Sequence, residues 1–341
     1  MITWRYHLLS LTAVFLALAL GILVGISISD SGAVETGQAG LVANIQPDHD
    51  LNVMQDSQSP TQVAAAVLSK MEPVLEKEKP DWVLVYGDTN STLAGALAAA
   101  KLNAGLAHIE AGMRSYNREM PEEINRLVAD HCSDLFFCPT KTAVRNLARE
   151  GITRRVYLVG DTMYDSLLRF SEIARKRSRV LRELGLKPKE YLLATVHRPH
   201  NTDVPANLGK ILEAFGRIPE TIIFPVHPRT RKKMALWKGT ASWKPTHVKM
   251  IRPVGYLDML MLERNARAIL TDSGGVQKEA YCFGVPCLTL RSETEWGETL
   301  ESGWNAVVGE DLSRVPEKLK ALSVSRKKRP PFGSGNAGRL I

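Results

Sequence analysis

After a joint near residues 30–40, the sequence alternates between short apolar runs and segments with helical periodicity. The first helical segment begins with the capping pattern Ser59-Pro60-Thr61-Gln62, which pairs free amide groups and places a proline in the first turn. Apolar residues then recur at helical spacing from Val63 to Leu75. Short apolar strands that alternate with such helices predict parallel βαβ units.

The same pattern divides the chain into two domains of the α/β class, each with a doubly wound, Rossmann-like sheet. Expected strands of the first domain are 82–86, 106–109, 135–138 and 156–159, with helices near 91–102, 121–132 and 140–150. A long polar helix over 163–185 leads to the second domain. Expected strands of the second domain are 191–196, 221–226, 248–251, 268–271 and 287–290.

The first thirty residues follow a different pattern. From Leu8 to Ile28 the chain is apolar and uncharged, which matches the roughly 20 residues that cross a bilayer. Arg5 precedes this segment and Asp30 follows it, so a membrane span here would leave the amino terminus in the cytoplasm. A secretory signal peptide is the alternative interpretation.

The charge and the cysteine content limit the kinds of ligand and metal that we expect. The net charge of +8 lies beyond residue 32, so the globular part attracts phosphorylated ligands or anionic surfaces, although an excess of this size is commonly ordinary surface charge. The basic run Arg326–Arg329 has no interleaved aromatic residues, and we expect no nucleic-acid partner. Four cysteines without metal-ligand spacing indicate buried thiols in a reducing compartment, with neither a metal nor disulfides.

Candidate acid/base groups follow predicted strands or open helices in the first domain. Asp88 and Glu110 come directly after apolar strands, and Glu122 opens a helix. Because ligands of open α/β sheets bind at the carboxyl ends of the strands, we expect these carboxylates at one edge. Burial beside other carboxylates would make Glu110 a proton carrier near neutral pH, whereas Asp88 taken alone would be a helix cap. Arg126 flanks the cluster and is expected to pair with a carboxylate or a phosphate.

The second domain carries a candidate phosphate site. Ser273, Gly274 and Gly275 follow an apolar strand and enter a helix, whose free amide groups could hold phosphate oxygens. Glu279 lies one turn further, where its carboxylate could accept ribose hydroxyls. His197 and His227 end two other strands of the domain, which favours proton transfer or hydrogen bonding to a pyrophosphate.

Taken together, these motifs closely resemble the non-hydrolysing UDP-N-acetylglucosamine 2-epimerases from about Val34 to Ile341. The resemblance rests on six segments in order: Gly87-Asp88-Thr89, His108-Ile109-Glu110-Ala111-Gly112, Pro121-Glu122-Glu123-Ile124-Asn125-Arg126, His197-Arg198, Pro225-Val226-His227-Pro228 and Asp272-Ser273-Gly274-Gly275-Val276-Gln277.

This resemblance implies a glycosyltransferase-B-like arrangement with the active site in the cleft. Residues 33–162 would form the first domain, 163–325 the UDP-binding domain, and 326–341 a segment that returns to the first domain. The implied reaction eliminates UDP to leave a 2-acetamidoglucal and re-adds it after C2 is reprotonated on the opposite face. It needs no cofactor and no metal. The family further implies a cytoplasmic homodimer acting on a UDP-sugar, UDP-N-acetylglucosamine or UDP-N-acetylmannosamine, ahead of surface polysaccharide synthesis.

The resemblance also assigns site residues in this sequence. Those similar to the family's catalytic groups are Asp88, Glu110, Glu122 and His197. Those expected to bind the substrate are Arg126, His227, Ser273, Gly274, Gly275, Glu279 and Arg291.

The front of the chain departs from the family, because the usual first βα unit with its Gly-Thr-Arg-Pro-Glu turn is missing. Our hypothesis is that residues 1–32 are foreign or mis-assigned, that the chain as written is impaired, and that it is membrane-anchored only if residues 8–28 form a real span. Three alternatives remain. Trp296, which marks a subgroup, favours a UDP-2,3-diacetamido-uronate as the substrate. The others are a glycosyltransferase and a non-catalytic sugar-nucleotide-binding protein on the same fold.

Overall fold

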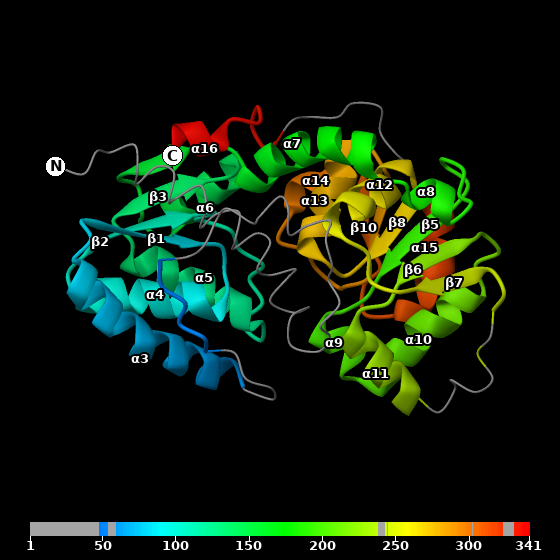
Figure 1. The fold of residues 1–341 in the computed structure, drawn as a ribbon, viewed down its shortest axis with the longest axis horizontal. Coiled ribbons are helices and arrows are strands. Elements are labelled where there is room, and N and C mark those ends of the chain that lie inside the picture. The colour runs from blue at the N-terminus through cyan, green and yellow to red at the C-terminus, as the bar shows by residue number, and fades with distance from the viewer. Residues whose placement is uncertain (1–47, 54–58, 238–242, 244, 302, 323–330) are drawn as a thin grey trace. The chain divides into compact units, whose positions relative to one another are not determined.

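A computed structural model describes residues 48–53, 59–237, 243, 245–301, 303–322 and 331–341 (Figure 1). The chain divides into two compact units, with the boundary between Leu158 and Val159. The predicted span at 8–28 and the basic run at 326–329 lie outside the described residues. Within the described ranges, no helix combines the length and the apolar character needed to cross a membrane.

The first unit contains one parallel sheet, with strands in the order β1-β2-β3-β4 in its described part. Its core joins Val85 and Leu106 of the sheet to alanines of two helices, Ala96, Ala99 and Ala129. Small side chains on these helices allow close packing on the sheet. The elements are α3 (Pro60–Glu78), β1 (Trp82–Tyr86), α4 (Asn90–Lys101), β2 (Gly105–Ile109), α5 (Pro121–Cys132), β3 (Leu135–Cys138), α6 (Lys141–Arg149) and β4 (Val156–Leu158).

Local capping explains where the first helices begin. Ser59 and Gln62 form the predicted capping box at the start of α3. A second capping box opens α4, formed by Thr89 and Thr92. Thr89 is therefore the helix cap, and the Asp88 side chain is available for other contacts.

The second unit contains a six-stranded parallel sheet in the order β10-β9-β8-β5-β6-β7, with helices on both faces (Figure 1). Its elements are α7 (Thr162–Arg177), α8 (Val180–Glu183), β5 (Leu192–Thr195), α9 (Pro199–Thr202), α10 (Pro205–Gly216), β6 (Ile222–Pro225), α11 (Pro228–Leu236), β7 (Val248–Ile251), α12 (Tyr256–Asn265), β8 (Ala268–Thr271), α13 (Gly274–Phe283), β9 (Cys287–Thr289), α14 (Gly297–Glu301), β10 (Asn305–Val307), the 3-10 helix η1 (Leu312–Arg314), α15 (Val315–Ala321) and α16 (Ala337–Leu340).

Two hydrophobic clusters cover the opposite faces of this second sheet. Leu192 belongs to one cluster and its neighbour Leu193 to the other. A strand buried on both faces needs apolar residues at successive positions, which is why the strands read as continuous apolar runs. The predicted α/β class with two parallel sheets is confirmed.

The predictions differ from the structure at two elements. The helix expected over 163–185 is wrong as one element, because α7 ends before Ser178 and α8 is separate. Ser178 takes an extended backbone, and its Oγ donates to Asp258 Oδ1 on α12 at 2.6 Å. Strand β10 was not predicted, since a three-residue edge strand beginning with Asn305 has no periodicity to reveal it. Of the four free cysteines, Cys138 and Cys287 are buried as expected, and the other two are partly exposed.

Candidate active site

The turns after β1 and β2 lie side by side at the carboxyl edge of the first sheet. Tyr86 pairs with Ile109 at the ends of these strands, and the Gly87 amide donates to the Ile109 carbonyl at 3.0 Å. Asp88 and Glu110 directly follow these paired residues. The parallel register therefore places two acidic residues that are 22 positions apart in adjacent turns.

Asp88 is held by Arg126 of α5. Arg126 donates to Asp88 Oδ2 from Nε at 3.0 Å and from Nη2 at 2.6 Å, and it donates from Nη1 to Glu123 at 2.6 Å. The Arg126 side chain is only 2% exposed, whereas that of Asp88 is 30% exposed. Arg126 thus pairs with carboxylates in this structure, and it fixes Asp88 while leaving that carboxylate accessible to a ligand.

The two glutamates that open α5 have different surroundings. Glu123 accepts the Ser115 and Tyr116 amides at 2.8 and 2.9 Å and the Ser115 hydroxyl at 2.9 Å. Burial alone would raise the pKa of Glu123, but these bonds and the charge of Arg126 hold it below its usual value. Glu123 is therefore an anchor for the loop before α5, and Glu122 beside it is half-buried in the first turn.

Glu110 has a left-handed backbone, with φ of 71°. Such a conformation costs a non-glycine residue of the order of 1 kcal/mol or more, and it is found where the surroundings impose it. Here the amides of Glu110 and Ala111 both donate to the Phe137 carbonyl at the end of β3, at 3.1 and 3.2 Å. The chain consequently turns sharply after β2, and Glu110 stands at that turn.

The candidate site of the second unit lies between β5 and β8, which are adjacent in the sheet although β6 and β7 lie between them in the sequence. The strand order reverses at this point, and α/β sheets bind ligands at such switch points. His197 follows β5, and Ser273 follows β8 as the cap residue of α13. The predicted histidine and phosphate turn thus meet at one edge.

Asp272 joins these two turns, and the sequence reasoning did not single it out. It is fully buried, and its carboxylate accepts the amides of His197 and Arg198 and the side-chain amide of Asn201, each at about 3 Å. The His197 ring nitrogen Nδ1 lies 3.4 Å from Asp272 Oδ1. Its place immediately before Ser273 in the motif was the one available signal.

His227 lies next to His197, with ring centroids 6.1 Å apart. His227 Nδ1 accepts the Arg229 amide at 3.2 Å, so this nitrogen carries no proton. Burial, together with the charges of His197 and Arg229, lowers the pKa of His227. A neutral His227 therefore offers an Nε2 proton as a hydrogen-bond donor, which suits an anionic ligand.

The two glycines at the start of α13 differ in the space around them. A Cβ atom on Gly274 would lie 2.6 Å from Glu295 Oε1, so the Glu295 side chain would have to shift to make room for it. A Cβ atom on Gly275 would meet nothing closer than Met163 Cε at 3.4 Å. Glu295 in turn pairs with Arg291 at 3.0 Å, which places the predicted Arg291 in an ion pair beside this turn.

Trp296 and Lys278 pack together behind the same turn. The Trp296 side chain is 3% exposed, and Lys278 Nζ lies 3.9 Å from the centroid of its ring. Lys278 also pairs with Asp161 at 2.7 Å. The tryptophan that marks a subgroup in the sequence is thus part of the interior of the second unit.

Glu279 lies in the interior as well, among other polar groups. Its Oε1 accepts the Tyr256 hydroxyl at 3.0 Å, and it faces the fully buried Glu263 of α12. Burial raises the pKa of Glu279 to about 7, although Tyr256, Glu263 and Lys278 lower it in part. Its predicted role toward ribose hydroxyls stays a prediction, since this carboxyl already has partners.

Replacement of Glu263 by glutamine is expected to stabilise the protein above neutral pH. Burial raises the pKa of Glu263 well above 4.5 and that of its neighbour Glu279 to about 7, so both carboxyl groups bind protons in the folded state at pH values where the unfolded chain does not. The free energy of unfolding therefore falls as pH rises through that window. Glu263→Gln should flatten this fall and raise the melting temperature at pH 8 by about 3 °C or more. Calorimetry from pH 5 to 8 measures the melting temperature of each variant, and Glu213→Gln, at an exposed position on α10, is the control. An unchanged profile would contradict the buried acid pair.

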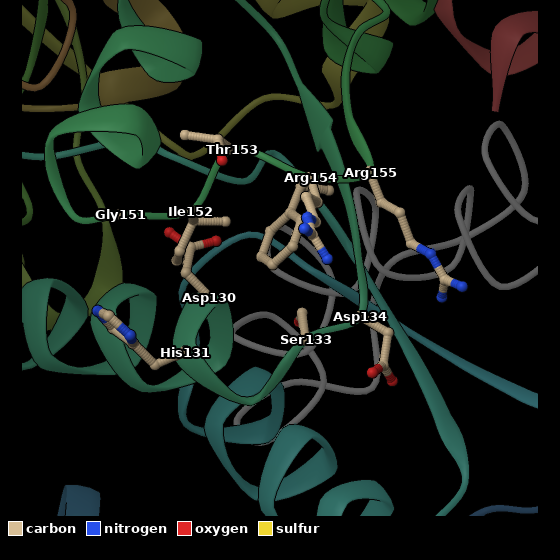
Figure 2. Close-up of a pocket in the computed structure, with 10 residues that line it drawn as sticks. Asp130, His131, Ser133, Asp134, Gly151, Ile152, Thr153, Arg154 and Arg155 are labelled. Atoms are coloured by element: carbon tan, nitrogen blue, oxygen red, sulfur yellow. The ribbon is translucent and has the colours of Figure 1, made fainter.

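An open hollow of about 350 Å³ in the first unit lies away from these residues (Figure 2). Its lining comes from the end of α5 and from the residues that precede β3 and β4, at the end of the sheet opposite to Asp88 and Glu110. None of the predicted site residues lines it. The lining residues are Asp130, His131, Ser133, Asp134, Phe136, Gly151, Ile152, Thr153, Arg154 and Arg155.

The structure thus brings together part of the predicted set in each unit. In the first unit, Asp88 and Arg126 are in contact, and the turn of Glu110 adjoins that of Asp88. In the second unit, His197, His227 and Ser273 share one sheet edge. Among the described residues, no cluster of three histidine, cysteine or acidic side chains has the geometry of a metal site.

Comparison with known proteins agrees with this geometry. A sequence profile of the UDP-N-acetylglucosamine 2-epimerase family matches residues 32–341. A UDP-N-acetylglucosamine 2-epimerase homolog of Methanococcus maripaludis is 51% identical, over 86% of this chain and 83% of that protein. The UDP-2,3-diacetamido-2,3-dideoxy-D-glucuronate 2-epimerase of Pseudomonas aeruginosa is 44% identical, over 81% of this chain and 76% of that protein.

A crystal structure shows the same likeness in three dimensions. The Methanocaldococcus jannaschii UDP-GlcNAc 2-epimerase, in complex with UDP-GlcNAc and UDP, is 41% identical and superposes with a TM-score of 0.82, over 89% of this chain and 85% of that one. Profile, sequence identity and fold all agree over nearly the whole described chain. The chain belongs to the UDP-N-acetylglucosamine 2-epimerase family.

Proposed function

We propose that this protein is an isomerase that inverts C2 of a UDP-2-acetamido sugar and interconverts UDP-N-acetylglucosamine and UDP-N-acetylmannosamine. The carboxyl edge of the first sheet supports this proposal, because Asp88 and Glu110 lie in the adjacent turns that follow β1 and β2. Two nearby carboxyl groups suit a reaction that removes a proton from one face of a carbon and returns a proton to the other. Family membership favours UDP-N-acetylglucosamine as the substrate.

The proposed reaction is an elimination of UDP followed by its addition to the same carbon. The bond between C1 and the UDP oxygen breaks, and its electron pair leaves with UDP. A carboxylate takes the C2 proton, so that the C–H electrons form the C1–C2 double bond of a 2-acetamidoglucal. A carboxylic acid then protonates C2 on the opposite face, and the UDP oxygen bonds to C1 again. Positive charge that develops at C1 during departure of UDP is stabilised by the nearby carboxylates.

The second unit supplies the binding of UDP in this proposal. The amide groups at the start of α13 suit phosphate oxygens, and Gly275 leaves room for a close approach. His227 offers a neutral Nε2 donor and His197 stands beside it. Held on this unit, the departing UDP would be retained until the glucal has been reprotonated.

Incubation with UDP-N-acetylglucosamine in heavy water is expected to place deuterium at C2. The elimination gives the C2 proton to a carboxyl group, and that group exchanges with solvent before the proton returns. Proton NMR of the sugar ring measures the loss of the H2 signal together with the appearance of the manno epimer. Binding of UDP-N-acetylglucosamine without any exchange at C2 would refute the epimerisation and favour a non-catalytic binding protein.

A second candidate substrate is a UDP-2,3-diacetamido uronate, which the 44% identity to the Pseudomonas aeruginosa enzyme favours. Parallel exchange assays with both nucleotides separate the two candidates. Trp296, the residue that raised this alternative, is buried against Lys278. Any effect of Trp296 on substrate choice would therefore be transmitted through the packing of α13. The homodimer and the cytoplasmic location implied by the family stay predictions.

A further inference from the structure

His108 occupies a central position behind the proposed catalytic carboxylates. It lies on β2, is fully buried, and belongs to none of the groups to which a role has been given above. Its Nε2 lies 2.8 Å from the Gly87 carbonyl, in the turn that carries Asp88. Its Nδ1 lies 2.7 Å from Asp130 Oδ1 on α5. One ring thus connects the turn after β1 to the helix behind the sheet.

Both partners of the ring are acceptors. A backbone carbonyl has no proton to donate, so Nε2 must donate to Gly87. Asp130 accepts the Gly112 amide at 3.1 Å and pairs with Arg114 Nη1 at 2.7 Å, so it is a carboxylate and Nδ1 must donate as well. His108 is therefore a buried imidazolium.

Its charge is balanced within the first unit. Arg114 continues the network to Glu150 through two bonds of 2.6 and 2.7 Å, so that two positive groups face two negative ones. Burial by itself lowers the pKa of His108, but Asp130, Gly87 and Glu110 outweigh it and raise it above the usual value. Cys138 on β3 is the other titratable group near Asp130, and burial raises its pKa to about 12, which keeps it a neutral thiol.

The network also reaches the turn that carries Glu110. Asp130 holds the Gly112 amide, two positions after Glu110. A Cβ atom on Gly112 would lie 2.4 Å from the Ala143 carbonyl, so this part of the turn is tightly enclosed. The His108–Asp130 pair consequently connects to the turns of both proposed catalytic carboxylates, from Gly87 on one side and from Gly112 on the other.

We propose that His108, as an imidazolium paired with Asp130, is a positioning residue that holds the turns of Asp88 and Glu110 in their relative places. This role rests on the proposed function. It requires no contact of His108 with the substrate, which fits the full burial of the ring. Because proton transfer is sensitive to displacements of about 1 Å, loosening either turn should slow the chemical step more than substrate binding.

Two substitutions separate the two bonds of the ring. The amide nitrogen of glutamine reaches the position of Nε2, so His108→Gln keeps a donor to Gly87 and loses the bond to Asp130. Asparagine instead matches Nδ1, so His108→Asn keeps the bond to Asp130. Both variants remove the charge. We expect kcat to fall roughly 10- to 100-fold in each, with KM within about twofold of the original.

Leu106→Ala is the matched control for loss of stability. Leu106 is fully buried on the same strand, at the end away from the two turns. Leu106→Ala should lower the melting temperature while leaving the kcat of the folded protein unchanged. If His108→Gln and His108→Asn lose activity only in proportion to their unfolded fraction, with the kcat of the folded protein unchanged, the positioning role is wrong.

Nitrogen NMR of the full chain labelled at histidine tests the charge independently of activity. Two protonated ring nitrogens on His108 at pH 7 are expected, and a single protonated nitrogen would overturn the proposal. Failure of the wild-type enzyme to exchange the C2 proton would refute the epimerisation itself. Failure of the proposed function can be distinguished from failure of the His108 proposal, because the nitrogen NMR signals report the charge of the ring whether or not the enzyme exchanges the C2 proton.

Discussion

Glu110→Gln is expected to lower kcat for epimerisation by about 10²- to 10⁴-fold, the usual contribution of one positioned acid or base. Glutamine has the size of glutamate and keeps a polar side chain in the left-handed turn after β2, but it cannot take up or return a proton. KM should change little. Exchange of H2 in heavy water, followed by NMR, measures the chemical step directly and is expected to fall in parallel with kcat.

Glu119→Gln provides the control for this substitution. Glu119 is an exposed glutamate in the loop before α5, and the same chemical change there should leave exchange unaltered. Asp88→Asn is expected to act like Glu110→Gln but with a lower melting temperature, since Arg126 loses part of its ion pair. Wild-type rates of exchange in both Glu110→Gln and Asp88→Asn would show that neither carboxyl group carries the C2 proton.

Gly275→Ala is expected to weaken UDP binding about tenfold or more while leaving the folded protein intact. An added methyl group at this position meets ordinary van der Waals distances within the protein. It would, however, fill the space in which a phosphate approaches the amides of α13, and loss of one charge-assisted hydrogen bond costs about 1.5–3 kcal/mol. Titration calorimetry with UDP gives the affinity, and thermal unfolding without ligand gives the stability.

Substitutions of two other glycines serve as controls for Gly275→Ala. A methyl group on Gly297, at the start of α14, meets nothing within 4 Å, so Gly297→Ala should change neither quantity. Gly274→Ala should lower both, because its Cβ collides with the Glu295 carboxylate. Unchanged UDP affinity in Gly275→Ala would exclude a phosphate site at this turn and would leave the start of α13 as a simple structural cap.

Much of the fold and of the site could be predicted from the sequence because the relevant signals are local. The capping box at Ser59 and the apolar strand at 82–86 depend on neighbouring residues, and both are confirmed. Motif residues that follow strands of a parallel sheet must lie at its carboxyl edge, so the general position of Asp88 and Ser273 could be expected as well. The break at Ser178 was missed because its cause is Asp258, 80 positions away.

What the sequence by itself determined is therefore the alternation of strands and helices, the two-domain α/β class and the motifs that mark the family. Only the tertiary structure decided which polar side chains stay accessible and which serve as internal supports. Glu122 and Glu123 are neighbours of the same type, yet Glu123 anchors a loop through Ser115 and Tyr116. Asp272 and the His108–Asp130 pair became visible only through contacts between distant segments. The physical reason is that hydrogen-bond partners and burial, which set both charge state and position, arise from packing that no local pattern records.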